Sequence, residues 1–312
     1  MDCSAAADRK RTLFFDLSRR VKLRITGADR LRWLNGQVTN DVRKLSAEMT
    51  IAACVLNARG KMDAHIFISA RTDYMLVDSD AALHDSLIAR FDRYVIADDV
   101  MIEDVTDEFS IFHSLTEMSP NNALQVTSAD RFGLPGFDVW ISRSASHELV
   151  SGLGSEWHLC NDVEAETFRI EQGVPAWGRE LTGDTIPVEA HLEESCIDYA
   201  KGCYIGQEII SRMKMSGQKN KSLHGLVTQS STAMAEGMKL FATEATEKEI
   251  GWITSAAWSD RFRRHLALGY VRRPFNVPGS TVYVHLPGAG ATALTIVQLP
   301  FSRGLAGAAG PA

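Results

Sequence analysis

The sequence predicts an α+β protein whose C-terminal part is a small all-β barrel. Strand-like and helix-like segments alternate over the first 160 residues, as they do in proteins that pack helices against sheets. From about residue 222 to 301, short strand-like runs alternate with turns, which is typical of a barrel. Because 312 residues are long for a single hydrophobic core, we expect two or three domains.

The first part of the chain supplies the alternating elements. Residues 14–27 are strand-like, and the apolar spacing of residues 28–45 fits a short helix and its exit. Two strand-like runs meet at Gly60, and an amphipathic helix is expected over residues 80–96. Further strands are expected at residues 101–105, 109–115, 123–128 and 137–143, followed by a short helix that ends at glycines.

A long irregular stretch separates these elements from the expected barrel. Asp162 is expected to cap a helix that ends near Gly173, and residues 174–208 then show no regular pattern. Irregular stretches of this length are either functional or disordered, and the tryptophan, tyrosine, leucine and isoleucine content argues against disorder. We therefore expect the functional site in this stretch.

Composition excludes several classes of function. A formal net charge of −6 and a pI near 5.9 argue against general affinity for nucleic acid. No apolar run is long enough for a signal segment or a membrane span, so we expect a cytoplasmic protein with no membrane partner. No cysteine or histidine spacing of the usual zinc or iron–sulfur kind is present, so no metal site is expected. The cysteines are odd in number and scattered, and we expect reduced thiols at Cys3, Cys54, Cys160, Cys196 and Cys203.

The octapeptide KGCYIGQE, residues 201–208, is the first candidate site. Gly202 and Gly206 permit backbone conformations closed to other residues, and a helix is expected to begin directly behind them. Cys203 then lies beside a helix N-terminus, and both the helix dipole and Lys201 favour its thiolate. The sequence leaves two interpretations open: Cys203 is a reactive thiol, or it is a small apolar side chain in a tight loop.

Glu171 is the second candidate. It follows Arg169 near the end of a predicted helix, just before the irregular stretch. A carboxylate there is suited to accept two parallel N–H bonds from a heteroaromatic ring such as a pterin. The alternative is a solvated glutamate on a helix surface.

Five segments, in order along the chain, resemble the YgfZ family of folate-binding proteins, which is related to the aminomethyltransferase (T-protein) of the glycine cleavage system. They are LNGQVTNDV, LNARGKM, FRIEQGVPAWGREL, PVEAHLEE and KGCYIGQEIISR. The similarity runs from about Phe15 to Phe301. The KGCYIGQE segment is typical of the YgfZ branch, whereas the other segments are shared more loosely with T-protein.

The resemblance implies a fold of three domains arranged as a ring around a folate channel. A discontinuous first domain would comprise residues 1–48 and 160–221 and hold the folate site. A ferredoxin-like α+β insert would comprise residues 49–159, and a C-terminal β-barrel residues 222–312.

The resemblance also implies a function and its residues. It implies a tetrahydrofolate-binding accessory protein for iron–sulfur cluster assembly or repair, whose partners are client enzymes or assembly proteins. Glu171 matches the pterin-contacting glutamate of T-protein, and Cys203 matches the characteristic thiol of YgfZ proteins. The other candidate cofactor-binding residues lie in the matched segments: Arg169, Trp177, Lys201 and Tyr204.

One departure keeps an alternative open, namely a tetrahydrofolate-dependent aminomethyl or methyl transferase. T-protein carries a catalytic aspartate in a G-x-x-D-D turn, and GKMDAH places Asp63 at the first acidic position but Ala64 at the second. Asp63 is therefore either a carboxylate that acts on a folate nitrogen or a strand-edge residue after a turn.

Overall fold

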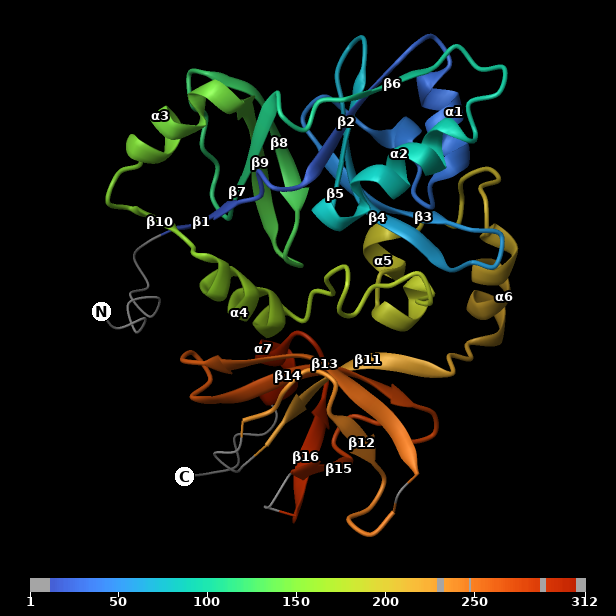
Figure 1. Cartoon of the computed structure of the whole chain (residues 1–312), viewed down its shortest axis with the longest axis vertical. Coiled ribbons are helices and arrows are strands. Elements are labelled where there is room, and N and C mark those ends of the chain that lie inside the picture. The colour runs from blue at the N-terminus through green and yellow to red at the C-terminus, as the bar shows by residue number, and fades with distance from the viewer. Residues whose placement is uncertain (1–11, 229–232, 247, 287–289, 307–312) are drawn as a thin grey trace.

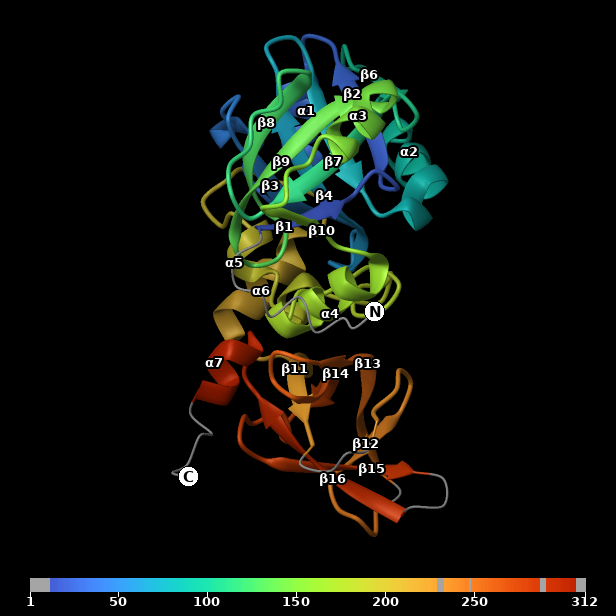
Figure 2. The ribbon, with the colours of Figure 1, turned by 90° about the vertical axis from the view of Figure 1, so that its left-hand side faces the viewer.

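The computed structural model describes residues 12–228, 233–246, 248–286 and 290–306, and its strands form two five-stranded sheets and one closed barrel. The two sheets occupy one end of the molecule and the barrel the other, with helices α4, α5 and α6 between them (Figure 1). A view turned by 90° shows the same three levels (Figure 2). The predicted α+β fold class with a C-terminal barrel is thus confirmed.

One sheet has the order β10-β1-β7-β9-β8, and helix α3 (Ser146–Ser151) follows its strand β9. Its core includes Phe14 stacked on Phe112, with ring centroids 5.2 Å apart. The strands are β1 (Thr12–Asp16), β7 (Phe109–Ser114), β8 (Ala123–Asp130), β9 (Pro135–Ser142) and β10 (Trp157–Leu159).

The other sheet has the order β3-β4-β5-β2-β6 and carries helices α1 (Arg30–Gln37) and α2 (His84–Asp92). Trp33 and Phe91 from these helices pack edge to face over the buried aliphatic side chains of the sheet, which shields those side chains from water. The strands are β2 (Val21–Thr26), β3 (Thr50–Leu56), β4 (Met62–Ala70), β5 (Met75–Ser79) and β6 (Met101–Asp104).

A buried ion network joins the two sheets. The guanidinium of Arg131 donates to both carboxylate oxygens of Asp78 on β5, at 2.8 Å each, and to Asp138 on β9 at 2.6–3.1 Å. Its side chain is 3% exposed, and Arg20 pairs with Asp78 as well. Because all these charges have partners, the two sheets are held in one relative position.

The strand pairing can be compared with the domain boundary expected after residue 48. Residues 49–159 supply four strands of each sheet, and the fifth strands, β1 and β2, come from before residue 48. Strands from residues 1–48 thus belong to the same two sheets as the strands of residues 49–159, the segment expected to form the insert. The domain boundaries themselves remain predictions.

The middle level contains α4 (Asp162–Gln172), α5 (Glu193–Cys196) and α6 (Gln207–Ser216). The predicted end of α4 is correct, since Gly173 ends the helix with a left-handed φ of 72°. The predicted cap is wrong by one residue. Asn161 caps the helix, and Glu164 completes a capping box by accepting the Asn161 N–H.

The barrel closes in the order β11-β14-β13-β12-β15-β16. Its interior is an aliphatic cluster that includes Leu226, Leu240 and Ile253. The strands are β11 (Lys221–Val227), β12 (Lys239–Phe241), β13 (Glu249–Ser259), β14 (Arg264–Arg272), β15 (Thr281–Leu286) and β16 (Gly290–Val297), and helix α7 (Phe301–Ala306) follows. Across the part of the chain described here, no helix has the length and apolar character that crossing a bilayer requires.

Candidate functional site

The loop that precedes α6 presents Cys203 to solvent. Cys203 is exposed, and among the described residues its sulfur has no hydrogen-bond partner. The predicted helix begins at Gln207, capped by Gly206 with a left-handed φ of 84°. Gly202 departs from the prediction, because it is absent from the residues of positive φ and has open space around it. Only Gly206 therefore depends on the conformational freedom of glycine.

The turn between β3 and β4 packs directly against this loop. A Cβ on Gly206 would lie 2.6 Å from the carbonyl oxygen of Asn57, and a Cβ on Gly60 would lie 2.7 Å from the Cβ of Ile209. Neither contact tolerates a side chain on the glycine. The segments LNARGKM and KGCYIGQE lie about 140 residues apart in the chain. In the fold they pack so closely that only glycine fits at positions 60 and 206.

Lys201 fixes the other side of the loop. Its ammonium donates to the carbonyl oxygens of Asn35 at 2.6 Å, Val38 at 2.5 Å and Asn40 at 2.8 Å, and it is 5% exposed. These three acceptors use all three N–H donors of the ammonium, so Lys201 binds the LNGQVTNDV segment. Burial lowers the pKa of Lys201 to about 8. Tyr204 lies under the same ammonium, with 5.1 Å from Nζ to its ring centroid.

Two buried thiols lie behind the loop. Cys54 on β3 and Cys196 on α5 belong to one buried core cluster, and the sulfur of Cys196 is 3.5 Å from Nε2 of His65. Thr39 links the two backbones, accepting from the Cys54 N–H at 2.9 Å and donating to the Cys196 carbonyl at 2.5 Å. Burial and the neighbouring Cys196 raise the pKa of Cys54, which keeps that thiol protonated.

Arg169 lies in a closed network between α4 and the barrel. Its five N–H donors all have acceptors: Val174 O at 2.5 Å, Glu166 at 2.6 and 2.8 Å, Ser255 Oγ at 2.7 Å and Glu180 at 2.9 Å. Burial alone would lower the pKa of Arg169, but its bonds to Glu166 and Glu180 raise it above the ordinary value. No donor is left for a ligand, so the geometry assigns Arg169 to the joint between α4 and β13.

Glu171 is also buried, and it faces the hairpin between β13 and β14. Its Oε1 accepts from Ser259 Oγ at 2.5 Å, and Arg261 lies 4.0 Å from its Oε2. Burial raises the pKa of Glu171, against the lowering effects of Ser259 and Arg261. The carboxylate is therefore not the solvated helix glutamate of the alternative interpretation, and its Oε2 has no hydrogen-bond donor among the described residues.

Asp63 lies on β4, two residues after the turn, with its side chain 31% exposed. Arg90 from α2 donates to its Oδ2 at 3.0 Å and also to Gln37 and the Leu56 carbonyl at 3.2 Å each. The aspartate is thus an ion-paired, partly exposed residue near the start of β4, which is an interior strand of its sheet. Trp177, the remaining candidate, is partly buried and packs against two of the core clusters.

A cavity of about 670 Å³ opens where the middle level meets the barrel. It is lined by Gly173 at the end of α4, by residues of α5 and α6, by His224 of the barrel and by Arg303 of α7. Lys214 lowers the pKa of Glu193 in this lining by donating at 2.7 Å, and Tyr199 donates to the same oxygen at 3.1 Å. The cavity thus places a charged carboxylate and several cations beside a smaller number of apolar side chains.

Three comparisons with known proteins relate this geometry to a family. Residues 221–302 match the glycine cleavage T-protein C-terminal barrel domain. The tRNA-modifying protein YgfZ of Yersinia pestis (strain Pestoides F) is 25% identical over 240 residues, which cover 69% of this chain and 71% of that protein. The protein of the same name from Yersinia enterocolitica is 24% identical over 234 residues, with the same coverage.

The chain is related to the YgfZ proteins. It also has the fold of the aminomethyltransferase T of the glycine cleavage system from Bartonella henselae, with a TM-score of 0.82 over 96% of this chain and 88% of that one. The identity to that structure is 18%, so this likeness concerns the fold alone. Both parts of the predicted resemblance are confirmed.

The structure brings the YgfZ-like segments together but separates the two candidate groups. Cys203 precedes α6, whereas Glu171 lies in the last turn of α4, and these helices lie on opposite sides of α5 (Figure 1). Sequence reasoning missed the Cys54–Cys196–His65 group and the cavity. The three residues of that group come from β3, β4 and α5, and no short spacing in the sequence signals their contact.

Proposed function

We propose that this protein is a tetrahydrofolate-binding accessory protein that supports the assembly or repair of iron–sulfur clusters in other enzymes. The observation that carries the proposal is an exposed thiol, Cys203, on a loop whose two sides are fixed by buried contacts. The relation to YgfZ proteins supports the same assignment.

The fixed loop suits a thiol that meets other proteins. Lys201 holds one side by three hydrogen bonds, and Gly206 packs against the Asn57 carbonyl on the other. Between them the sulfur is exposed and positioned three residues before the cap of α6. Such a thiol is preorganised to act as a thiol donor, as a redox group or as a transient ligand of a metal cluster. Because the loop is already ordered, docking of a partner protein costs little conformational entropy.

The cavity beside the barrel is where we propose the folate binds. Its volume suits a ligand of this size, and Lys214, Lys219 and Arg303 provide positive charge for a glutamate tail. Glu171 remains the predicted acceptor for the pterin edge. Its neighbour Gly173 lines the cavity, although Glu171 itself faces Ser259.

Replacement of Cys203 tests the proposal directly. Cys203→Ser is expected to bind tetrahydrofolate as the wild type does, because the sulfur is assigned to chemistry and the cavity lies elsewhere. It is expected not to restore iron–sulfur enzyme activities in cells that lack the native protein. Gly202→Ala is the matched control, since it alters the same loop in open space. Full rescue by Cys203→Ser would show that the shape of the loop matters and the sulfur does not.

Calorimetry distinguishes the two carboxylates available to the pterin. Glu171→Gln is expected to weaken tetrahydrofolate binding by about 1.5 to 3 kcal/mol, the usual contribution of a hydrogen bond to a charged group. Glu193→Gln is the comparison, because Glu193 lines the cavity. Weakening by Glu193→Gln alone would place the pterin at Glu193 and remove Glu171 from the site.

The second candidate function is transfer of an aminomethyl or methyl group to tetrahydrofolate. The fold shared with an aminomethyltransferase and the partly exposed Asp63 favour it. Incubation with tetrahydrofolate and a methylated amine or an aminomethyl-loaded carrier protein separates the two functions. Formation of methylene-tetrahydrofolate and ammonia from the aminomethyl-loaded carrier, or of methyl-tetrahydrofolate and the demethylated amine from the methylated amine, would replace the accessory role by a catalytic one. Either product is expected to be lost in Asp63→Asn.

The partners follow from the same proposal. Client enzymes or assembly proteins that handle iron–sulfur clusters would dock at the Cys203 loop. The name of the relatives, tRNA-modifying protein, suggests that one client class acts on tRNA. The acidic net charge of −6 favours contact with such an enzyme over direct contact with its RNA.

A further inference from the structure

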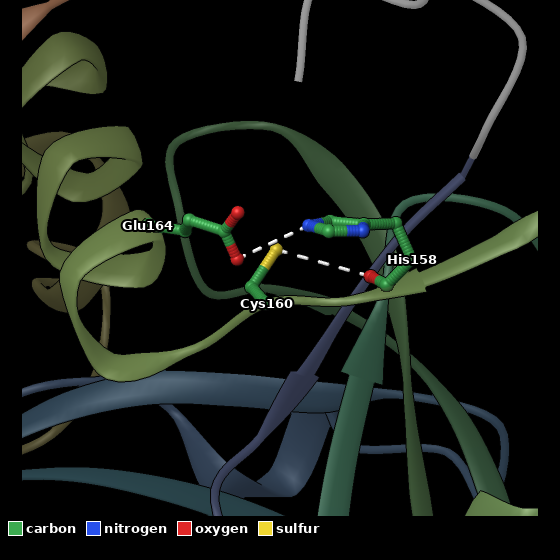
Figure 3. Close-up of side chains that lie close together, drawn as sticks. All are labelled: His158, Cys160 and Glu164. Atoms are coloured by element: carbon green, nitrogen blue, oxygen red, sulfur yellow. Dashed lines mark hydrogen bonds and ion pairs between the residues drawn. The ribbon is translucent and has the colours of Figure 1, made fainter. Parts of the chain in front are cut away.

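A cluster of three metal-ligating side chains lies outside the site described so far. His158, Cys160 and Glu164 converge where β10 leads into α4, and their ligand atoms all lie within 4.8 Å of one another. Figure 3 shows the three side chains pointing toward one another across the turn between strand and helix. None of the three residues lies in the Cys203 loop or in the lining of the cavity.

The backbone fixes each of the three positions. His158 and Cys160 are two residues apart on an extended segment, so their side chains leave the same face. The Cys160 N–H donates to the Phe14 carbonyl at 2.8 Å and continues the pairing with β1. The Glu164 carboxylate is held by the capping box, where it accepts the Asn161 N–H at 2.9 Å. The three donors are therefore positioned by strand pairing and helix capping.

The distances suit a small cation. Nε2 of His158 is 3.1 Å from Oε2 of Glu164, with a proton between them. Ligands of tetrahedral zinc, at about 2.0 to 2.3 Å from the metal, lie roughly 3.3 to 3.6 Å apart. A cation could replace the shared proton with movements of about 1 Å in the side chains.

The donor types select the class of metal. Thiolate and imidazole together favour zinc and its neighbours in the transition series over magnesium or calcium, which prefer oxygen ligands. The side chains of His158 and Glu164 are 26% and 18% exposed, whereas Cys160 is the more deeply buried member, so solvent reaches the group at His158 and Glu164.

We propose that His158, Cys160 and Glu164 form a zinc-type site that joins β10 to α4, with water as the fourth ligand. Binding releases the thiol proton of Cys160 to solvent or buffer. The metal takes a neutral imidazole through Nε2, so the proton between His158 and Glu164 leaves Nε2 and the ring carries its proton on Nδ1. No electron is transferred. The metal would tie the end of one sheet to the helix that carries Arg169 and Glu171. The spacing H-x-C-x-x-x-E is not one of the usual zinc patterns, which is why the sequence predicted no metal site.

Titration of the untagged, reduced and metal-free protein with Zn²⁺ tests the site. Calorimetry is expected to show one equivalent bound per chain. Cys160→Ser and Glu164→Gln are each expected to weaken binding by more than the 10- to 100-fold that loss of an outer-shell partner usually costs. Glu164→Gln is the informative variant, because glutamine preserves the capping box and hence the helix.

Cobalt substitution supplies an independent readout. Co²⁺ is expected to give a thiolate charge-transfer band in the near ultraviolet that Cys160→Ser abolishes and Cys203→Ser retains. Circular dichroism of each variant checks that it is folded. Absence of stoichiometric binding, or binding that survives Cys160→Ser and is lost in Cys203→Ser, would overturn the proposal.

Discussion

The Cys203 loop and the Arg169 network are both built around a buried cation, but their partners differ. Lys201 is bound by three backbone carbonyls, whereas Arg169 is bound by two carboxylates, a carbonyl and a hydroxyl. Both cations have acceptors for all their N–H donors, so neither has a donor left for a ligand. The regions differ in what lies next in the chain: the Cys203 loop carries an exposed thiol two residues after its cation, whereas the Arg169 network is closed.

The partners also set the sensitivity of each cation to pH. Burial lowers the pKa of Lys201 to about 8, and the nearby carboxylates of Asp41 and Asp198 offset only part of that effect. Arg169, paired with Glu166 and Glu180, has its pKa raised despite burial. Raising the pH above about 8 is therefore expected to neutralise Lys201 in the loop, whereas Arg169 in the network keeps its charge.

The largest effect is expected from Arg169→Met. Removal of the guanidinium leaves Glu180, whose side chain is fully buried, without its cation. Breaking a buried pair in this way costs about 3 to 5 kcal/mol in the free energy of unfolding. Urea denaturation measures the loss, and Arg179→Met, on an exposed pair with Glu236, is expected to cost under about 1 kcal/mol. Equal costs for the two variants would contradict the network's role.

Lys201→Met is expected to cost about 3 kcal/mol, because three inward carbonyls lose their donor. The loss of stability in this variant is expected to increase with pH. The folded pKa of about 8 lies below the ordinary value of 10.5, so between these values the unfolded state holds more protons. The free energy of unfolding of the wild type therefore rises across this window relative to that of the variant, by at most about 3 kcal/mol.

Denaturation at pH 7, 8, 9 and 10 measures this difference. Lys22, whose pKa burial also lowers to about 8, is present in both proteins, so the difference isolates Lys201. A stability difference that is independent of pH would mean that the lysine is not desolvated in the folded protein.

Gly206→Ala is expected to cost about 1 to 2 kcal/mol, because alanine is strained at a φ of 84° and its Cβ would meet the Asn57 carbonyl. Gly202→Ala, four residues earlier, has open space and is expected to change stability by less than about 0.5 kcal/mol. Thermal unfolding of the two variants compares them directly. Similar losses would mean that the loop is not held at Gly206.

The smallest effect on stability is expected from Cys203→Ser, within about 0.5 kcal/mol of the wild type, because the exposed sulfur supports no part of the fold. Its effect on reactivity is expected to be the largest of the set. Iodoacetamide labelling followed by mass spectrometry is expected to modify Cys203 well before Cys54 and Cys196, which are fully buried. Faster labelling of the buried pair would contradict the exposed position of the loop.

The sequence by itself determined the local structure of this protein. The alternating patterns gave the fold class, Gly173 marked the end of α4, and the segment after Gly206 gave the start of α6. These features depend on backbone preferences within a few residues, which are written in the local sequence. The motifs also identified Cys203 as a residue of interest, and the structure places it at the surface.

Only the tertiary structure decided which charged residues of those motifs are free to act. Lys201 donates to carbonyl oxygens of residues 35–40. Arg169 donates to Ser255, and Glu171 accepts from Ser259, both on strand β13 of the barrel. His158, Cys160 and Glu164 meet because strand pairing and a helix cap turn three donors inward. Whether a charged side chain is satisfied or available depends on partners brought by folding from distant parts of the chain, and no local pattern records those partners.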